Sequence, residues 1–453
     1  MRMNKSLPAR IAPQPGWGNN FWLALIPVLV CTTLLFAPVP VVFGQVIQIP
    51  ERVLLEPISG QDAVRILNGV RNGVRTPELP APSAPEIPFF TYSTFASRNG
   101  KTYLGSIVGG SPFSSTTNNK TTTVDFVIVP LVLRFDFGGG VVITFDPTAE
   151  DPDCLGAGNT ALSLTQRSPL FQPVSFTMNG VNVGNTTYPD AFQRGEFAKI
   201  IGPNYHLAFN VTTLPAQTVT LPASATHPAT ASVFQIFGLC GHNTGTTNIP
   251  GGLGVVDVFT FDLTIRSLIT QLHLNAAQFP LFLLYNSVES AGDSVTLSVA
   301  GGYHNSTTLQ VDNPGQTYGV ADFENRTLTP GIQDISIASH EVAEWINDPS
   351  VNNLVPPWGG QGEIPAGRCL NILEVGDPLT FTSFPSGEVQ AQAPIQTQPR
   401  TMTLNGFTYH LQELAFFSWF YGKPSIGAGG LFSDNGTFKT DAGAICPFGI
   451  VVP

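Results

Sequence analysis

A histidine and two glutamates, His340, Glu341 and Glu344, lie within a little more than one helical turn of each other. At 100° per residue, a helix places Glu344 about 40° and Glu341 about 100° from His340, so the three side chains share one face. Two ligands one turn apart can reach one metal ion, and a carboxylate beside the first ligand can polarise a water molecule. The spacing therefore predicts a metal site in which His340 and Glu344 are ligands and Glu341 is the general base.

A third ligand is expected from the segment that follows a glycine-rich loop. This segment offers Glu374 and Asp377. We expect Glu374 to bind the ion and Asp377 to orient a ligand or to replace Glu374. One imidazole with two or three carboxylates is a harder donor set than two histidines, so calcium or manganese is an alternative to zinc. The additional negative charge should weaken the Lewis acidity of a bound zinc ion.

The surrounding elements follow from hydrophobic periodicity and turn residues. The helix that carries His340 should begin near Asp334, a good N-cap residue, and end by Asp348, because Pro349 disfavours helical backbone before it. Without a metal, the three residues would form an exposed polar face of that helix. We also expect strands at 121–137, 141–145, 205–211, 282–288, 295–303 and 317–323, and helices at 190–201, 262–272 and 411–421.

The segment His340-Glu341-Val342-Ala343-Glu344 resembles the active-site helix of zincin metallopeptidases, whose motif is HExxH. Glu344 stands where the family has its second histidine. The resemblance covers roughly residues 255–380, and it implies a mixed sheet beside the active-site helix, a zinc ion and a peptide or protein substrate. The wider pattern, in which Asp-Pro and Glu-x-Gly-Asp follow, also resembles secreted bacterial proteins distantly similar to the phosphate-induced, exordium-like family. That second resemblance implies little chemistry.

Composition and the N-terminal residues indicate an exported protein. Basic residues precede an apolar run at 21–43, and Gly44 offers a cleavage point before Gln45. We expect no stable membrane span after cleavage, although the run is long enough to serve as an uncleaved anchor. Charged residues make up 11% of the chain and the formal net charge is -11. This balance argues against a nucleic-acid partner.

Four of the five cysteines lie in the mature part of the chain. An even number in an oxidising compartment is typical of two disulfides, and proximity in sequence favours the pairs Cys154–Cys240 and Cys369–Cys446. Four unpaired thiols are the alternative. Among the histidines, we expect His206, His227, His242, His273 and His304 to be solvated or hydrogen-bonded, with His304 beside a strand that could border the site.

The sequence thus predicts an α+β protein with four parts. These are a signal peptide (1–44), a proline-rich tether or pro-segment (45–95), a β-rich region (96–250) and a zincin-like metal-binding region (251–453). Two functions are compatible with this organisation. One is a secreted metallopeptidase that hydrolyses peptide bonds with a metal-activated water. The other is a non-catalytic secreted or cell-surface binding protein with a structural metal. The oligomeric state is not predicted.

Overall fold

The computed structural model describes residues 86–113, 120–226, 228–236, 239–290, 299–308, 310–324, 333–358, 369–379, 400–441 and 446. The expected signal peptide and residues 45–85 of the expected tether lie outside these ranges. The described chain is a strand-rich α+β structure. Its first strand, β1 (Phe89–Ala96), overlaps the end of the expected tether, so the folded part begins before residue 96.

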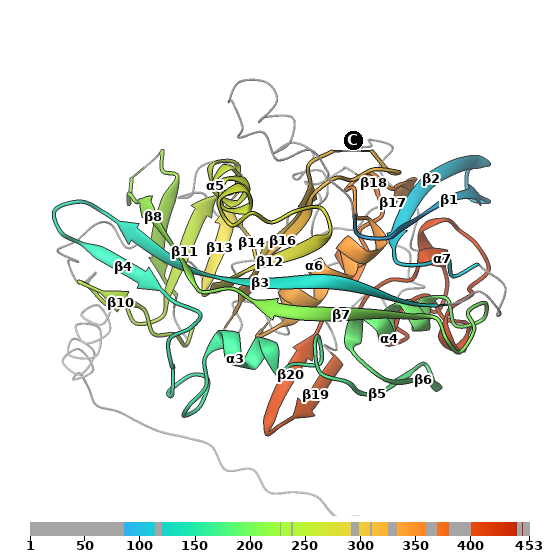
Figure 1. Ribbon diagram of the computed structural model, residues 1–453, viewed down its shortest axis with the longest axis horizontal. Coiled ribbons are helices and arrows are strands. Elements are labelled where there is room, and N and C mark those ends of the chain that lie inside the picture. The colour runs from blue at the N-terminus through green and yellow to red at the C-terminus, as the bar shows by residue number, and fades with distance from the viewer. Residues whose placement is uncertain are drawn as a thin grey trace, which may run out of the picture. The chain divides into compact units, whose positions relative to one another are not determined.

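An eight-stranded sheet forms the centre of the described structure, with β3 running across it (Figure 1). Its strand order is β10-β4-β3-β12-β16-β15, and β7 and β8 also pair with β3. The strands are β3 (Thr121–Asp136), β4 (Val142–Phe145), β7 (His206–Thr213), β8 (Gln217–Pro222), β10 (Thr244–Gly245), β12 (Gln278–Tyr285), β15 (Gly302–Ser306) and β16 (Thr317–Phe323). β12 is parallel to both β3 and β16, whereas β15 is antiparallel to β16. Because β3 and β12 pair, the boundary expected at residue 250 does not divide the sheet.

Smaller sheets and helices surround this centre. A second sheet has the order β14-β13-β11-β9. Its strands are β9 (Ala231–Gln235), β11 (Gly252–Asp257), β13 (Ser287–Ser290) and β14 (Val299–Ala300). Two-stranded sheets pair β1 with β2 (Lys101–Val108), β5 (Val174–Met178) with β6 (Val181–Thr186), β17 (Leu354–Trp358) with β18 (Leu370–Ile372), and β19 (Arg400–Leu404) with β20 (Phe407–Leu411). The helices are α3 (Ala161–Gln166), α4 (Tyr188–Glu196), α5 (Val258–Gln271), α6 (Ser336–Asn347) and α7 (Phe417–Phe420), with 3-10 turns η2 (Asp377–Leu379) and η3 (Ala428–Gly430).

Apolar cores cover both faces of the central strands. Along β12, Leu281 and Leu283 join the core that contains the apolar residues of α6. Phe282 and Leu284 join the core that contains those of α5. Parallel strands buried on both faces are apolar almost throughout, as β12 is. The sheet thus gives α6 a rigid support on one face while α5 covers the other.

Most of the expected elements are present. The hairpin at 121–145 is confirmed: β3 and β4 pair antiparallel around the Gly138 to Gly140 turn. The strand expected at 317–323 is β16, and the helix expected at 262–272 is α5, which begins earlier because the Asp257 side chain accepts a hydrogen bond from the Thr260 backbone N–H. The helix expected at 190–201 is α4, and β7 follows it.

Two expectations about elements are wrong. The strand expected at 282–288 is two strands, β12 and β13, separated by Asn286 with φ of 44°. The helix expected at 411–421 is only the short α7, because Leu411 ends β20, which pairs with β19. Aromatic residues at helical spacing in that segment are packing residues of the core. Of the strand expected at 295–303, residues 295–298 lie outside the described ranges, and β14 and the start of β15 occupy most of the rest.

Trp345 anchors α6 to the sheet. Its ring stacks on Phe279 of β12 with centroids 3.7 Å apart, and its indole N–H donates to the Thr317 hydroxyl at 3.0 Å. Trp345→Ala should therefore lower the free energy of unfolding by about 3 to 5 kcal/mol, the usual loss for removing a large buried aromatic side chain. Trp345→Phe, which keeps a ring against Phe279, should lose less. Denaturant unfolding measures both, and a loss below about 1 kcal/mol for the alanine variant would contradict this packing role.

Candidate metal centre

The ends of α6 are fixed by two aspartates. The helix begins at Ser336 with Ile335 as N-cap, so the expected N-cap role of Asp334 is wrong. Asp334 has φ of 47° and instead accepts hydrogen bonds from the backbone N–H groups of Ile335 (2.6 Å) and His410 (2.9 Å), which ties β20 to the helix start. At the other end, Asp348 is the C-cap, which confirms the prediction that the helix ends by this residue.

The polar face of α6 is buried. All twelve residues of the helix are buried, and His340, Glu341 and Glu344 are at most 1% exposed. The alternative of an exposed polar helix face is therefore wrong. Ionisable groups are rarely buried unless they are paired, so these three side chains must be neutral or must have partners of opposite charge.

Glycines allow two segments to cover this face closely. A Cβ atom on Gly302 of β15 would lie 2.5 Å from the Val320 carbonyl oxygen and 3.1 Å from Glu341 Cγ. A Cβ atom on Gly376 would lie 2.3 Å from His340 Nδ1. Only glycine permits these approaches without movement of the neighbours. β15 and the loop at Gly376 thus bring their side chains to the helix.

The first group of possible ligands joins α6 to that loop. His340 Nε2 lies 2.9 Å from Glu344 Oε1 and 3.5 Å from Asp377 Oδ1. One ligand atom from each of these residues lies within 4.8 Å of the other two. The backbone N–H of Gly376 donates to Glu344 Oε1 at 3.0 Å and fixes that carboxylate. The structure therefore brings Asp377 to His340 and Glu344.

Glu374, the preferred third ligand in the sequence prediction, is outside this group of three. It is fully buried, and neither of its carboxylate oxygens has a hydrogen-bond partner in the described part of the chain. Its pKa is raised by burial and then by the charges of Glu344 and Asp377. Glu374 thus belongs to the same electrostatic cluster without meeting the two helix ligands.

A second group of possible ligands was not predicted from the sequence. His304 Nδ1 of β15 lies 3.6 Å from Glu341 Oε2 and 3.7 Å from Glu344 Oε2. Ligand atoms of these three residues also lie within 4.8 Å of one another. The sequence predicts His304 only as a solvated or hydrogen-bonded residue beside a strand that could border the site, whereas the pairing of β15 with β16 brings it to the carboxylates of α6.

Two further buried carboxylates extend the cluster. Glu289 of β13 and Asp322 of β16 are fully buried. Burial raises the pKa of both carboxyl groups, and the charge of Asp322 raises the pKa of Glu289 further. Asp322 Oδ1 accepts a hydrogen bond from the Ser287 backbone N–H at 3.0 Å. Both glutamate oxygens and Asp322 Oδ2 have no hydrogen-bond partner among the described residues. In the sequence, the signal for Asp322 is an acidic residue in a largely apolar strand, whereas Glu289 lies between polar residues and gives no such signal.

The protonation of the cluster is shifted by burial and mutual charge. Burial opposes the charged form of His340, but Glu344 and then Asp377 raise its pKa well above the usual value. Burial would raise the pKa of Glu344, yet His340 and other neighbours lower it. Burial and Glu344 raise the pKa of Asp377 to about 7, and burial lowers the pKa of His304 to about 4. Within the described residues, no lysine or arginine forms an ion pair with these groups.

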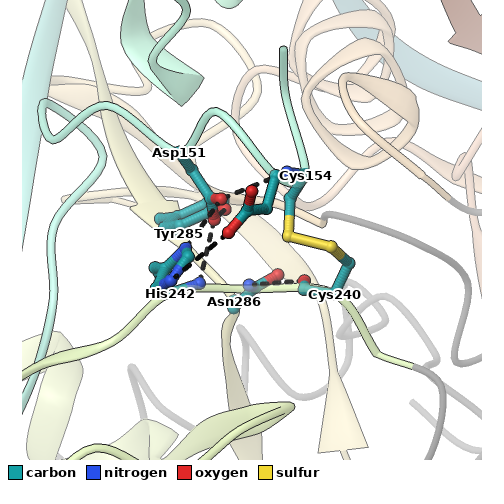
Figure 2. The surroundings of a disulfide bond; sticks show 7 residues. Asp151, Cys154, Cys240, His242, Tyr285 and Asn286 are labelled. Atoms are coloured by element: carbon teal, nitrogen blue, oxygen red, sulfur yellow. Dashed lines mark hydrogen bonds and ion pairs between the residues drawn. A yellow bond between two sulfur atoms is a disulfide. The ribbon is translucent and has the colours of Figure 1, made fainter. Parts of the chain in front are cut away.

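Both predicted disulfides are confirmed, with Cα–Cα distances of 5.6 Å in each of the Cys154–Cys240 and Cys369–Cys446 bridges. Figure 2 shows the first bridge beside Asp151, whose carboxylate accepts a hydrogen bond from the Tyr285 hydroxyl at 2.6 Å and contacts His242 Nδ1 at 3.0 Å.

The expectation of hydrogen-bonded histidines is confirmed for His242 and for His206, which pairs with Asp190 at 2.8 Å. His227 lies outside the described ranges.

No protein-family model, curated protein or solved structure matches the chain. The zincin and exordium-like resemblances therefore remain expectations based on the motif. In the residues that the structure describes, no helix is long and apolar enough to cross a membrane.

The cluster predicts how the stability of the metal-free protein depends on pH. The pKa values of Asp377 and Asp348 are both raised to about 7, so the folded state holds protons that the unfolded chain has released. The raised pKa of His340 acts in the same direction. This stabilisation is present at low pH and is lost as the pH rises through about 7. The melting temperature after chelation should therefore fall between about pH 6.5 and pH 8, a window above the unfolded pKa of histidine.

Asp377→Asn is the matched variant for this measurement, because it removes one of the carboxyl groups whose pKa is raised to about 7. It should make the melting temperature less dependent on pH in the same window. An equal or higher melting temperature of the chelated wild-type protein at pH 8 than at pH 6.5 would contradict the assignment.

Proposed function

We propose that this chain is an exported metalloprotein that holds a divalent cation at His340, Glu344 and Asp377. The observation that carries the proposal is the convergence of these three buried side chains, with Nε2–Oε1 and Nε2–Oδ1 distances of 2.9 and 3.5 Å. The two disulfides are consistent with an oxidising compartment, which supports export.

The electrostatic surroundings support a cation. Ionised carboxylates removed from water cost several kcal/mol each unless opposite charge offsets the loss. Both oxygens of Glu341, Glu374 and Asp377 lack hydrogen-bond partners within the described structure. Without an ion, most of these groups would have to be protonated. The closest ion pair of the cluster within the described residues would then be that of His340 and Glu344, at 2.9 Å. A divalent cation neutralises several carboxylates at once.

The donor atoms favour manganese or zinc over calcium. Calcium takes oxygen ligands, six to eight of them, whereas imidazole suits zinc and several transition metals. The carboxylates of Glu344 and Asp377 add hard oxygen donors, which manganese accepts well. The proposed site therefore takes a small divalent ion of the first transition series.

Metal analysis tests the proposal directly. We expect the purified, disulfide-bonded protein, loaded with Mn²⁺ or Zn²⁺ and desalted, to retain the ion, and His340→Ala to reduce affinity at this site by at least about 10-fold. His206→Ala is the matched control, because it removes a histidine that pairs with Asp190 away from the cluster. A wild-type protein that retains no ion, or a His340→Ala variant that binds as tightly as wild type at this site, would contradict the proposal.

A metallopeptidase is the second candidate function. It is favoured by Glu341, which stands beside His340 and has two carboxylate oxygens without hydrogen-bond partners among the described residues. Such a group could serve as a general base for a metal-activated water that hydrolyses a peptide bond. Against this candidate, a catalytic zinc site keeps one position open, whereas Glu341 and the three proposed ligands are at most 1% exposed. The geometry therefore supports a structural cation in a non-catalytic secreted protein more strongly than it supports a peptidase.

Glu341→Gln separates the two candidates. In a peptidase, this change should preserve the ion bound by His340 and lower peptide hydrolysis by about two to four orders of magnitude, the usual range for a lost general base. Wild type, Glu341→Gln and Glu344→Gln would be assayed with metal restored against a broad peptide library. Equal background turnover in all three, together with retained metal in wild type, would exclude the peptidase and leave the structural site.

A further inference from the structure

We infer that His304, Glu341 and Glu344 form a second cation site, so that the cluster holds a pair of divalent ions bridged by the Glu344 carboxylate. This inference rests on the proposed function, because Glu344 belongs to both sites. Its other two ligands come from outside the first group of three.

The hydrogen bonding of His304 prepares one ring nitrogen for a metal. His304 Nε2 lies 3.1 Å from the Asp348 backbone carbonyl oxygen, to which it can only donate. The neutral ring then presents the lone pair of Nδ1 to Glu341 and Glu344. Histidine ligands commonly donate their other ring N–H to a carbonyl or carboxylate, which fixes the tautomer and the ring orientation.

The distances around Nδ1 fit ligands of a shared ion better than hydrogen bonds. Nδ1 is 3.6 Å from Glu341 Oε2 and 3.7 Å from Glu344 Oε2. Both distances exceed a good N–H···O hydrogen bond. Two ligand atoms on a tetrahedral ion with bonds of about 2.0 to 2.2 Å lie about 3.3 to 3.6 Å apart. Nδ1 is thus spaced from each of the two carboxylate oxygens almost as ligands of one small ion would be, and all three ligand atoms lie within 4.8 Å of one another.

Glu341 supplies an independent observation. Its side chain is fully buried, and neither carboxylate oxygen has a hydrogen-bond partner in the described part of the molecule. One of these oxygens faces His304 Nδ1. A buried carboxylate without donors is costly, and a cation between it and the imidazole would remove that cost.

Glu344 can serve both ions because its two oxygens point to different partners. Oε1 lies 2.9 Å from His340 Nε2, and Oε2 lies 3.7 Å from His304 Nδ1. Bridging carboxylates of this kind are suited to two-metal sites with ions about 3.5 to 4 Å apart. Asp348 supports the arrangement, because its backbone carbonyl orients His304. Its carboxylate in turn accepts hydrogen bonds from the backbone N–H groups of Asn352 and Asn353, both at 3.0 Å.

A second site changes the role of Glu341. A carboxylate that binds an ion is not free to accept a proton from water, so Glu341 would be a ligand rather than a general base. The bridged pair therefore favours the structural candidate over the peptidase. The fitting ligand is a pair of small divalent ions, with Mn²⁺ as the convenient probe because electron paramagnetic resonance distinguishes coupled from isolated ions.

The experiment is a Mn²⁺ titration of the complete mature protein, read by bound metal per chain and by electron paramagnetic resonance. We expect two ions and a spin-coupled signal for wild type. His304→Ala and Glu341→Gln should each retain one ion with the signal of an isolated Mn²⁺, and so should His340→Ala. Circular dichroism and intact disulfides establish that each variant is folded. Glu341→Gln keeps the inference testable if His304→Ala does not fold, because the amide is nearly isosteric with the carboxylate.

The outcomes separate this inference from the proposed function. If wild type binds one ion, and His304→Ala and Glu341→Gln still bind it, the second site is overturned and the first is left intact. If wild type binds one ion, and both His304→Ala and His340→Ala lose it, the two groups form a single shared site, and the inference of a second site is overturned. If wild type binds one ion, and only His304→Ala and Glu341→Gln lose it, the proposed first ligand set is overturned. No bound ion in wild type would overturn both.

Discussion

The rest of the structure around α6 depends on one constraint, the burial of many carboxylates that have no lysine or arginine paired with them in the described part of the chain. Glu289, Asp322, Glu341, Glu344, Glu374 and Asp377 are all at most 1% exposed, and the described part of the chain provides only imidazoles beside them. Taking a charged group out of water costs several kcal/mol, and neighbouring like charges add to that cost. Such a cluster persists when its members are protonated or when a cation is shared among them. The raised pKa values of Glu341 and Glu374 describe the first state, and the two groups of convergent ligand atoms describe the geometry of the second.

The fold supplies this cluster from segments that only the sheet brings together. β12 and β16 are parallel neighbours, β15 pairs with the outer side of β16, and α6 packs on the face that these strands share. Stacking of Trp345 on Phe279 sets the position of the helix, and the loop that carries Gly376 closes the far side. That loop follows β18, whose start adjoins the Cys369–Cys446 bridge. The covalent link therefore lies next to the loop that supplies Glu374 and Asp377.

The sequence predicted the parts of this site that are local and missed those that depend on strand pairing. The turn between His340 and Glu344 and the apolar stripe of α6 are properties of one helix, so their spacing was sufficient. Asp377 was identified as a candidate, but whether it or Glu374 meets the helix depends on the path of a loop, which periodicity does not describe. His304 reaches the cluster because β15 pairs with β16, and no spacing along the chain encodes that contact. The misplaced helix at 411–421 had a related cause, since buried aromatic residues repeat at helical intervals in an irregular core segment as well as in a helix.

Full burial favours the structural over the catalytic use proposed for such a centre. A hydrolase must admit a peptide and a water molecule to its ion, and this requires at least one ligand position that faces a cleft. Here the helix face is covered by β15 on one side and by the Gly376 loop on the other, and the contacts at Gly302 and Gly376 leave no space even for a methyl group. An ion bound by His340, Glu344 and Asp377 would join α6 to the 374–377 loop, and one bound by His304, Glu341 and Glu344 would join α6 to β15. Because the ligands converge only in the folded chain, the free energy of metal binding would add directly to the stability of the fold. The proposed sites would therefore couple folding to metal binding, and a bound cation would act beside the two disulfides as a further cross-link.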